Sequence, residues 1–207
     1  MQHVPMGWEN ALPWWGLAFG IGYLLGSVPF GIFVSRVFAL GDLRSIGSGN
    51  IGATNVLRTG NKAAAALTLL ADMAKGFLPV WWFLGWGDIA GQAAGIGAVL
   101  GHCLPIWLWF RGGKGVATFI GVILALNPVA GAAVCATWLA TAFVFRFSSL
   151  AALLASLAAP ACLWLFDGPR AIICATLLSI FIWARHHQNI RRLIAGEEPR
   201  IGASKAT

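Results

Sequence analysis

Three short polar segments interrupt an otherwise apolar chain, and their residue types suit the binding of a phosphate. They cover residues 48–58 (SGNIGATNVLR), 111–118 (RGGKGVAT) and 186–198 (HHQNIRRLIAGEE). Arginine and lysine side chains offer charged hydrogen bonds to a phosphate, and glycines allow backbone N–H groups to approach it closely. Because apolar sequence surrounds all three segments, they predict a site that handles an anionic small molecule beside an acyl chain.

The segment at residues 48–58 carries the most specific signal. Its short polar side chains include Ser48, Asn50 and Thr54, which alternate with glycines, and Arg58 ends the run. A guanidinium binds a phosphate through two parallel N–H groups. The alternative is a tight, solvated connector between two helices, but such a connector does not need so many donors. The pattern therefore favours a phosphate site.

Lys114 lies in a glycine-rich turn directly before an expected helix, with Gly112, Gly113 and Gly115 around it. The N-terminus of a helix attracts anions, so the lysine and the helix together suit a phosphate. The turn is not a Walker A loop, which needs glycine where this chain has Leu108 and Ser or Thr where it has Gly115. Nucleotide hydrolysis is therefore not supported, and a basic turn at the membrane surface remains the alternative.

The segment after the last expected helix carries a histidine and an amide on one face. His186 and Asn189 are three residues apart, and Arg192 continues the same helical face. His186 is a candidate base, whereas the arginine also suits an anchor for anionic lipid headgroups. The pair Ser148 and Ser149 lies at the same membrane surface, where a helix N-cap is its alternative role.

Ionisable and thiol side chains inside the expected helices suit structural roles. Asp72 and Lys75 lie three residues apart in one helix, and such groups usually pair with each other within a membrane protein. We expect them to form a supporting pair, and His102 to be a hydrogen-bonded core histidine. The four cysteines have no metal-type spacing, and no two carboxylates form an evident acid–base couple. The sequence therefore predicts no metal site and no cofactor.

Transmembrane helices must hold these polar segments. Hydrophobic residues make up 58% of the chain and charged residues only 10%, against roughly 25% charged residues in soluble domains. The composition predicts one integral-membrane domain over residues 1–207. Apolar stretches predict helices at residues 14–40, 63–85, 89–110, 116–126, 129–145, 149–166 and 171–184.

The number of crossings depends on the short stretch at residues 116–126, because a bilayer crossing needs about 20 residues. Asn127 and Pro128 either separate two helices or kink a single one. With seven crossings, twelve of the 14 basic residues lie on one side, one lies on the other, and Lys75 lies within a helix. With six crossings the basic residues divide seven against six. Cytoplasmic loops are enriched in Lys and Arg, so the charges favour seven transmembrane helices, with the N-terminus outside and the C-terminus in the cytoplasm.

Six groups of residues follow one another in a characteristic order. They are residues 26–31 (GSVPFG), 48–58, 72–76 (DMAKG), 101–105 (GHCLP), 110–118 (FRGGKGVAT), and the set His186, Asn189, Ile190, Arg192, Leu193, Gly196 and Glu198. In this order and at this length they resemble the bacterial acyl-phosphate:glycerol-3-phosphate acyltransferase family. The resemblance covers nearly the whole chain and implies an all-α fold of seven transmembrane helices, with a site that faces the cytoplasm.

The resemblance implies transfer of a fatty acyl group from acyl phosphate to the 1-hydroxyl of sn-glycerol 3-phosphate. The products are 1-acylglycerol 3-phosphate (lysophosphatidic acid) and phosphate, at the start of phospholipid synthesis. The implied partners are glycerol 3-phosphate, a long-chain acyl phosphate, membrane lipid and the soluble enzyme that makes acyl phosphate, with no nucleic acid. The implied location is the bacterial inner membrane.

The same resemblance assigns roles to individual residues. Those expected to be catalytic are Ser48, Arg58, Lys114, His186 and Asn189. Those expected to bind substrate are Asn50, Thr54, Gly112, Gly113, Gly115, Ser148, Ser149, Arg192 and Gly196, and those expected to give structural support are Asp72, Lys75 and Glu198. The family is thought to use a substrate phosphate as the base, and His186 is the alternative.

Two other functions are less compatible with the sequence than acyl transfer from acyl phosphate. Acyl-CoA-dependent acyltransferases carry a histidine followed five residues later by aspartate, and no histidine of this chain has that partner. A transporter for an organic phosphate would share the basic, glycine-rich segments. However, carriers place polar groups near the middle of the membrane and usually contain repeated halves, whereas these motifs gather at one side and show no internal repeat.

Overall fold

The computed structural model describes residues 8–202, which fold into helices with no strand among them. This confirms the expected all-α class for the described part of the chain. The helices are α1 (Trp8–Gly26), α2 (Phe30–Val37), α3 (Ala53–Leu57), α4 (Lys62–Leu84), α5 (Asp88–Cys103), the 3-10 helix η1 (Ile106–Leu108), α6 (Val116–Leu126), α7 (Pro128–Phe145), α8 (Ser148–Asp167), α9 (Ile172–Arg185) and α10 (His187–Ile194).

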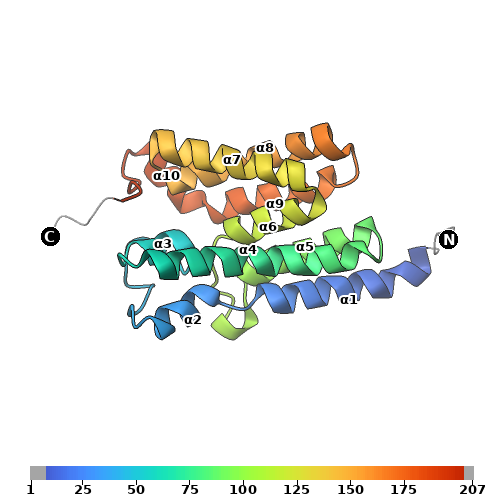
Figure 1. The fold of residues 1–207 in the computed structure, drawn as a ribbon, viewed down its shortest axis with the longest axis horizontal. Helices are drawn as coiled ribbons and strands as arrows, with labels where there is room; N and C mark the ends of the chain where they lie inside the picture. Colours follow the sequence, from blue (N-terminus) through green and yellow to red (C-terminus); the bar gives the residue numbers. More distant parts are fainter. Residues whose placement is uncertain (1–7, 203–207) are drawn as a thin grey trace.

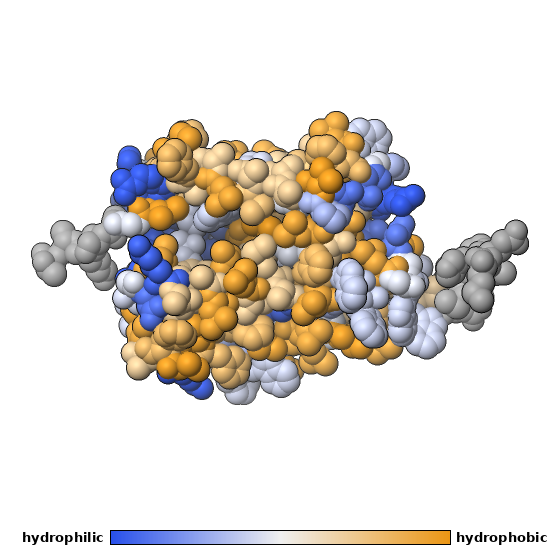
Figure 2. All heavy atoms as spheres, viewed as in Figure 1, coloured by the Kyte–Doolittle hydropathy of each residue, from blue (hydrophilic) through white to orange (hydrophobic). Residues whose placement is uncertain are grey.

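Five helical stretches are long and apolar enough to cross a membrane. They are Ala11–Val37, Lys62–Leu84, Asp88–Leu108, Pro128–Phe145 and Ser148–Asp167. Helices α6 and α9 are apolar but shorter. Figure 2 shows apolar side chains over the middle of one face and hydrophilic residues gathered at its two ends. Phe143 is 87% exposed and Ile173 76% exposed, as suits side chains that face lipid.

The prediction of one continuous helix over residues 14–40 is wrong in the middle of that range. Helix α1 ends at Gly26 and α2 begins at Phe30. Pro29 lacks a backbone N–H and disfavours the helical conformation of Val28 before it, so the chain leaves the helix there. The side chain of Lys75 donates to the Val28 carbonyl at 2.8 Å, which satisfies one acceptor that the break exposes.

The chain also turns between α6 and α7 instead of continuing as one kinked helix. The Asn127 side chain accepts a hydrogen bond from Ala130 N at 2.9 Å and so caps the start of α7, with Pro128 at the first helical position. Helix α7 packs against α6. The sequence left open a single kinked helix across Pro128, and the structure excludes it.

Figure 1 shows α1, α4 and α5 on one side of the molecule, α7, α8 and α9 on the other, and α6 between them. Helix α1 packs against α5, α4 against α6, and α7 against α8. At Gly22 and Gly26 of α1 an added Cβ would collide with the backbone of α5, and at Gly97 and Gly101 of α5 one would collide with α1. These glycines permit the close helix contact that the sequence predicts.

Helices α2, α3 and α10 lie at the same end of the molecule (Figure 1). Residues 48–58 include α3, residues 111–118 join η1 to the start of α6, and residues 186–198 include α10. The fold therefore gathers residues that are far apart in the sequence at one end of the bundle.

Candidate active site

The glycine-rich turn before α6 folds back onto the end of α5. Gly112 N–H donates to the Cys103 carbonyl and Gly113 N–H donates to the His102 carbonyl, both at 3.1 Å. An added Cβ at Gly113 would collide with the His102 ring, and Gly115 has φ +82°, which favours glycine. A substrate contact of Gly112 or Gly113 cannot use these two amides, because both hydrogens are already donated within the protein. The turn needs these glycines for its packing and shape.

A buried polar network lies beneath this turn. Lys75 Nζ is 2.7 Å from Asp72 Oδ1, which is the pairing expected from the sequence. His102 Nδ1 is 3.6 Å from the same carboxylate oxygen and 3.3 Å from Thr118 Oγ1. All four side chains are buried. Since His102 also contacts the turn, the network supports the backbone that carries Lys114, and Asp72 and Lys75 themselves lie away from the polar end.

Asn55 organises the first polar loop. Its Nδ2 donates to the Leu43 carbonyl at 2.7 Å, and its Oδ1 accepts from Ser48 N at 3.2 Å and from Arg58 Nη1 at 3.4 Å. The side chain is 1% exposed. The sequence places Asn55 among the polar residues of this loop but shows no sign of this central role. Through Asn55, the backbone of exposed Ser48 and the guanidinium of Arg58 are held together.

Glu198 holds two residues of α10 in place. Asn189 Nδ2 donates to Glu198 Oε1 at 2.6 Å, and Arg192 Nε donates to Glu198 Oε2 at 2.7 Å. A carboxylate accepts hydrogen bonds, so it fixes which end of the Asn189 amide faces it. Asn189 Oδ1 is then buried without a hydrogen-bond partner in the described part of the chain. This oxygen is available to a substrate hydroxyl.

Gly196 makes this return of the chain possible. It is exposed, has φ +72° and follows the end of α10. A left-handed conformation at this position favours glycine and lets Glu198 reach back to α10. Gly196 therefore shapes the site through its backbone conformation. A Cβ added at this position would meet no atom within 4 Å among the described residues.

His186 is buried at the junction of α9 and α10. Its Nδ1 lies 2.7 Å from the Ile182 carbonyl. Because a carbonyl can only accept, Nδ1 carries the hydrogen and the neutral ring keeps its lone pair on Nε2. Burial is the main cause that lowers the pKa of His186 to about 4, and Lys114 and Arg185 lower it further. At neutral pH His186 is therefore an uncharged hydrogen-bond acceptor.

The serine pair at the start of α8, Ser148 and Ser149, lies beside residues of the first and the third polar segments. Thr54 Oγ1 lies 3.1 Å from Ser148 Oγ, which ties the first polar loop to α8. Ser149 is buried and its hydroxyl has no well-formed hydrogen bond within the described residues. It nevertheless lies beside Glu198 and helps to lower the pKa of that carboxylate.

Positive charges outnumber negative ones where these segments meet. Burial lowers the pKa of Lys114 to about 8; Glu198 opposes this shift, while Arg192, Arg58 and Arg185 add to it. Burial also lowers the pKa of Arg58, which feels Glu198 and Arg192. Burial opposes ionisation of Glu198, but hydrogen bonds from Asn189 and Arg192, with the nearby Ser149 hydroxyl, leave its pKa below the usual value. We name Arg58, Lys114, Arg192 and Glu198 the charge cluster. Three cations around one carboxylate leave an excess of positive charge that suits a phosphate.

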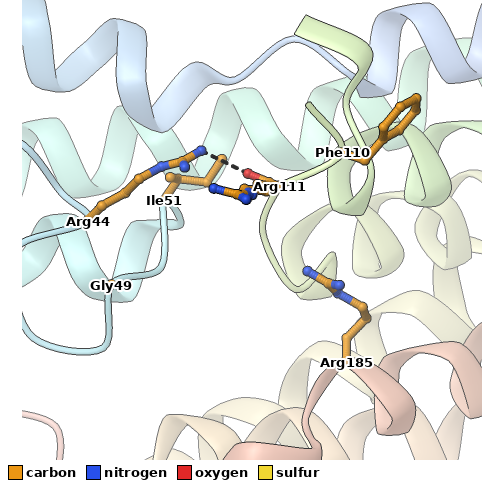
Figure 3. Close-up of a pocket in the computed structure, with 7 residues that line it drawn as sticks. Arg44, Gly49, Ile51, Phe110, Arg111 and Arg185 are labelled. Carbon is orange, nitrogen blue, oxygen red and sulfur yellow. Dashed lines mark hydrogen bonds between the residues drawn. The ribbon is translucent and has the colours of Figure 1, made fainter. Parts of the chain in front are cut away.

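A pocket of about 300 Å³ lies between these loops and the end of α9 (Figure 3). Its lining residues are Arg44, Gly49, Ile51, Phe110, Arg111, Gly112 and Arg185. The sequence pattern assigns no role to the three arginines. Arg44 comes from the connection between α2 and α3, Arg111 from the glycine-rich turn and Arg185 from the end of α9, so only the folded chain reveals their proximity.

Comparisons with known proteins identify the family. A family model for glycerol-3-phosphate acyltransferase matches residues 16–196. The chain belongs to the glycerol-3-phosphate acyltransferase family. It is therefore an acyltransferase, which confirms the enzyme class expected from the motifs.

Similar proteins of this family come from several bacteria. A glycerol-3-phosphate acyltransferase of Nitrobacter winogradskyi is 56% identical over 188 residues, with 90% of this chain and 96% of the relative covered. One of Agrobacterium fabrum is 54% identical over 196 residues, covering 94% and 96%. The chain thus spans nearly the full length of these relatives.

Two solved structures share the fold. The crystal structure of PlsY, an integral membrane glycerol 3-phosphate acyltransferase, in its glycerol 3-phosphate form has a TM-score of 0.84 and 35% identity, and covers 93% of this chain and 96% of that one. Its lysophosphatidic acid form has a TM-score of 0.82 and 33% identity, covering 91% and 95%. The chain is an integral membrane acyltransferase of the PlsY type.

Proposed function

We propose that this acyltransferase moves a fatty acyl group from acyl phosphate to the 1-hydroxyl of sn-glycerol 3-phosphate. The observation that carries the proposal is the charge cluster, where Arg192 pairs with Glu198 at 2.7 Å and the pKa values of Arg58 and Lys114 are both influenced by that carboxylate. Such a site binds dianionic phosphates. The relatives are named for glycerol 3-phosphate, and the related PlsY was solved with glycerol 3-phosphate and with lysophosphatidic acid.

The substrate hydroxyl attacks the acyl carbonyl carbon directly. A C–O bond forms to the glycerol oxygen, and the C–O bond to the phosphate breaks, so inorganic phosphate leaves with the electron pair. Acyl phosphate is a mixed anhydride and is already activated, so the protein has mainly to orient the reactants and stabilise charge. Arg58 and Lys114 offset the repulsion between the two phosphates. Asn189 Oδ1, which lacks a partner within the described chain, accepts a hydrogen bond from the glycerol moiety.

The hydroxyl proton goes to a substrate phosphate. A phosphate monoester has a second pKa of about 6, whereas the pKa of His186 is lowered to about 4. The phosphate dianion is thus the stronger base at neutral pH. His186 Nε2 instead accepts a hydrogen bond and orients the hydroxyl, and Ser48 contributes a further donor at the mouth of the site.

The site faces the cytoplasm of a bacterium, in a single domain over residues 1–207 that crosses the inner membrane seven times. The count of seven takes the five long apolar stretches and adds the shorter apolar helices α6 and α9. The excess of basic residues at the end that holds α10 supports this orientation. Glycerol 3-phosphate and a soluble enzyme that makes acyl phosphate would then reach the site from the same compartment.

Purified protein with labelled glycerol 3-phosphate and palmitoyl phosphate tests the reaction. We expect lysophosphatidic acid and phosphate in equal amounts, and no product from palmitoyl-CoA. Arg58→Ala should lower the rate by about 10²–10³, as for the loss of one preorganised charged donor. Arg191→Ala is the matched control, because the Arg191 side chain is exposed and takes part in none of the ion pairs of the described residues. Equal rates for the two variants, or a comparable rate with palmitoyl-CoA, would contradict the proposal.

Cysteine labelling in inverted and right-side-out vesicles tests the topology. In a background without the native cysteines, Ala63→Cys and Gln188→Cys should react only from the cytoplasmic side, and Asp88→Cys only from the outer side. All three positions are exposed. Labelling of Gln188→Cys from outside would overturn the count of seven.

A further inference from the structure

Helix α10 carries two residues of the site, but core packing does not hold it in place. Among its eight residues, His187–Ile194, only Asn189 is buried. A helix this short is not stable on its own and depends on tertiary contacts. Figure 1 shows α10 beside the adjoining ends of α7 and α8, and the helix packs against α8 and α9. Contacts from outside α10 must therefore fix Asn189 and Arg192 in their positions.

Glu198 provides such contacts, and its own position depends on the segment that follows it. The carboxylate is 6% exposed and accepts hydrogen bonds from Asn189 and Arg192. On one side, Gly196 joins Glu198 to α10 through an exposed, left-handed turn. On the other side lies a segment that we name the strap, which consists of Pro199, Arg200, Ile201 and Gly202. A carboxylate tethered only through Gly196 could swing away from α10, so the strap is needed to keep it there.

The strap is bound to the turn between α7 and α8. Ile201 N–H donates to the Arg146 carbonyl at 2.6 Å, and Arg146 Nη2 donates to the Ile201 carbonyl at 3.1 Å. The guanidinium of Arg200 lies over the Phe147 ring, 5.3 Å from the ring centre, where the face of the aromatic ring attracts a cation. Two hydrogen bonds and one cation–π contact therefore hold the strap on a single turn.

The backbone conformation of Arg146 lets this one residue bind the strap twice. Arg146 ends α7 with φ +61°, in the left-handed conformation that glycine usually adopts at the end of a helix. A long side chain is uncommon there. Because arginine occupies the position, its carbonyl accepts from Ile201 while its guanidinium donates to Ile201. A glycine would offer only the carbonyl.

The same turn continues directly into the serine pair of the site. Ser148 Oγ lies 3.1 Å from Thr54 Oγ1, and buried Ser149 lies beside Glu198. The turn therefore contacts the first polar segment through Ser148 and the strap through Arg146. A single set of contacts runs from this turn through the strap and Glu198 to α10.

We propose that Arg146 is a positioning residue of this acyltransferase, which holds the strap and through it the carboxylate of Glu198. With the strap bound, Glu198 keeps Asn189 Oδ1 turned toward the substrate and keeps Arg192 in the charge cluster. With the strap released, the amide can rotate and the guanidinium can leave. The ligand that depends on this arrangement is glycerol 3-phosphate, so the inference rests on the proposed function for the identity of the substrate.

Arg146→Gln tests the inference, and Arg36→Gln is the matched control, because it removes the same charge from an exposed position of α2. Binding of glycerol 3-phosphate is measured by calorimetry on the full-length, detergent-purified enzyme, without an acyl donor. Arg146→Gln should weaken this binding roughly 3- to 10-fold, as for the loss of about one hydrogen bond. The KM for glycerol 3-phosphate should rise by a similar factor, while the KM for palmitoyl phosphate should change less than about twofold. Arg36→Gln should change neither.

A double-mutant cycle with Glu198→Gln shows whether Arg146 acts through the carboxylate. In the Glu198→Gln background, Arg146→Gln should weaken glycerol 3-phosphate binding by less than about twofold, because residues that act through one network are not additive. A role in stability alone would give the same further loss in both backgrounds. Arg146→Lys keeps a charged donor and should recover part of the affinity.

Two shortened chains test the strap without any change to the turn. A chain that ends at Pro199 keeps Glu198 but loses Arg200 and Ile201, so it should bind glycerol 3-phosphate as weakly as Arg146→Gln does. A chain that ends at Gly202 keeps all three strap contacts and should bind normally. Amide hydrogen exchange of residues 187–198 should be faster in the chain that ends at Pro199, with α4 and α5 unchanged.

Two results would overturn the inference while leaving the proposed function intact. One is wild-type affinity for glycerol 3-phosphate in both Arg146→Gln and the chain that ends at Pro199. The other is a full, additive loss when Arg146→Gln is combined with Glu198→Gln. If the wild-type enzyme itself failed to bind glycerol 3-phosphate, the proposed function would be overturned together with this inference.

Discussion

Lys114→Arg provides the sharpest test of the site, because arginine keeps the positive charge at this position but does not lose its proton in the pH range of the assay. With a pKa of about 8, Lys114 is about 90% protonated at pH 7, half protonated at pH 8 and about 10% protonated at pH 9. If the charged form binds the phosphate, kcat/KM is retained below pH 8 and falls about tenfold for each pH unit above it. A guanidinium stays protonated throughout this range, so Lys114→Arg should have a lower rate at pH 7 but no alkaline decline up to pH 10.

The assay is the initial rate of lysophosphatidic acid formation from pH 6 to 10, with enzyme-free blanks to subtract acyl phosphate hydrolysis. Bound dianionic phosphate raises the pKa of Lys114, so the decline in kcat should lie at higher pH than the decline in kcat/KM. Lys62→Arg, at an exposed position, is the matched control and should keep the wild-type profile. A decline near pH 8 that persists in Lys114→Arg would show that another group titrates, and would refute the assignment.

Two further variants test the parts that support Lys114. Gly113→Ala adds a Cβ that collides with the His102 ring, so it should lower both the melting temperature and the activity. Gly20→Ala is the control and should lower neither, because no atom lies within 4 Å of its added Cβ. An unaffected Gly113→Ala would mean that the turn is not packed on α5. Asp72→Asn leaves buried Lys75 without its counter-charge and should cost about 3–5 kcal/mol of stability, measured by thermal unfolding in detergent. Asp72→Asn/Lys75→Met should recover most of that loss, and failure to recover it would argue against a simple charge pair.

The sequence predicted the helical class and most helix positions because lipid-facing helices need long apolar stretches. Helix α6 begins and ends at the predicted residues, Val116–Leu126. The break before Pro29 was missed because residues 14–40 are apolar on both sides of it, and hydropathy does not register one proline. The turn at Asn127 could not be separated from a kink until the cap on α7 was visible.

Candidate site residues could be predicted from the sequence where a polar or charged residue stands out in an apolar chain. Arg58, Lys114 and Asn189 stand out by type and spacing, and the structure brings their segments to one end. Asn55 belongs to the polar segment that the sequence singles out, but its organising role was not predicted, because that role lies in partners up to 12 residues away. Arg185 was also missed, because an arginine at the end of a helix looks like an ordinary membrane anchor until the glycine-rich turn is placed opposite it.

In the proposed mechanism, the positive charge that would bind the two phosphates also decides which group acts as the base. A histidine buried beside Lys114 and Arg185 is disfavoured in its charged form, first by burial and then by both cations, and its pKa falls to about 4. The same cations favour the dianionic form of a phosphate, so a bound phosphate is already deprotonated and able to accept a proton at neutral pH. A site of this kind therefore cannot hold a strongly basic histidine, but it can hold a substrate that brings its own base. Replacing His186 by Asn, which keeps a hydrogen-bond acceptor but cannot titrate, should lower kcat without moving the acidic limb of kcat/KM from about pH 6, the second pKa of a phosphate monoester. An acidic limb near pH 4 in the wild type that disappears in His186→Asn would instead identify the histidine as the base.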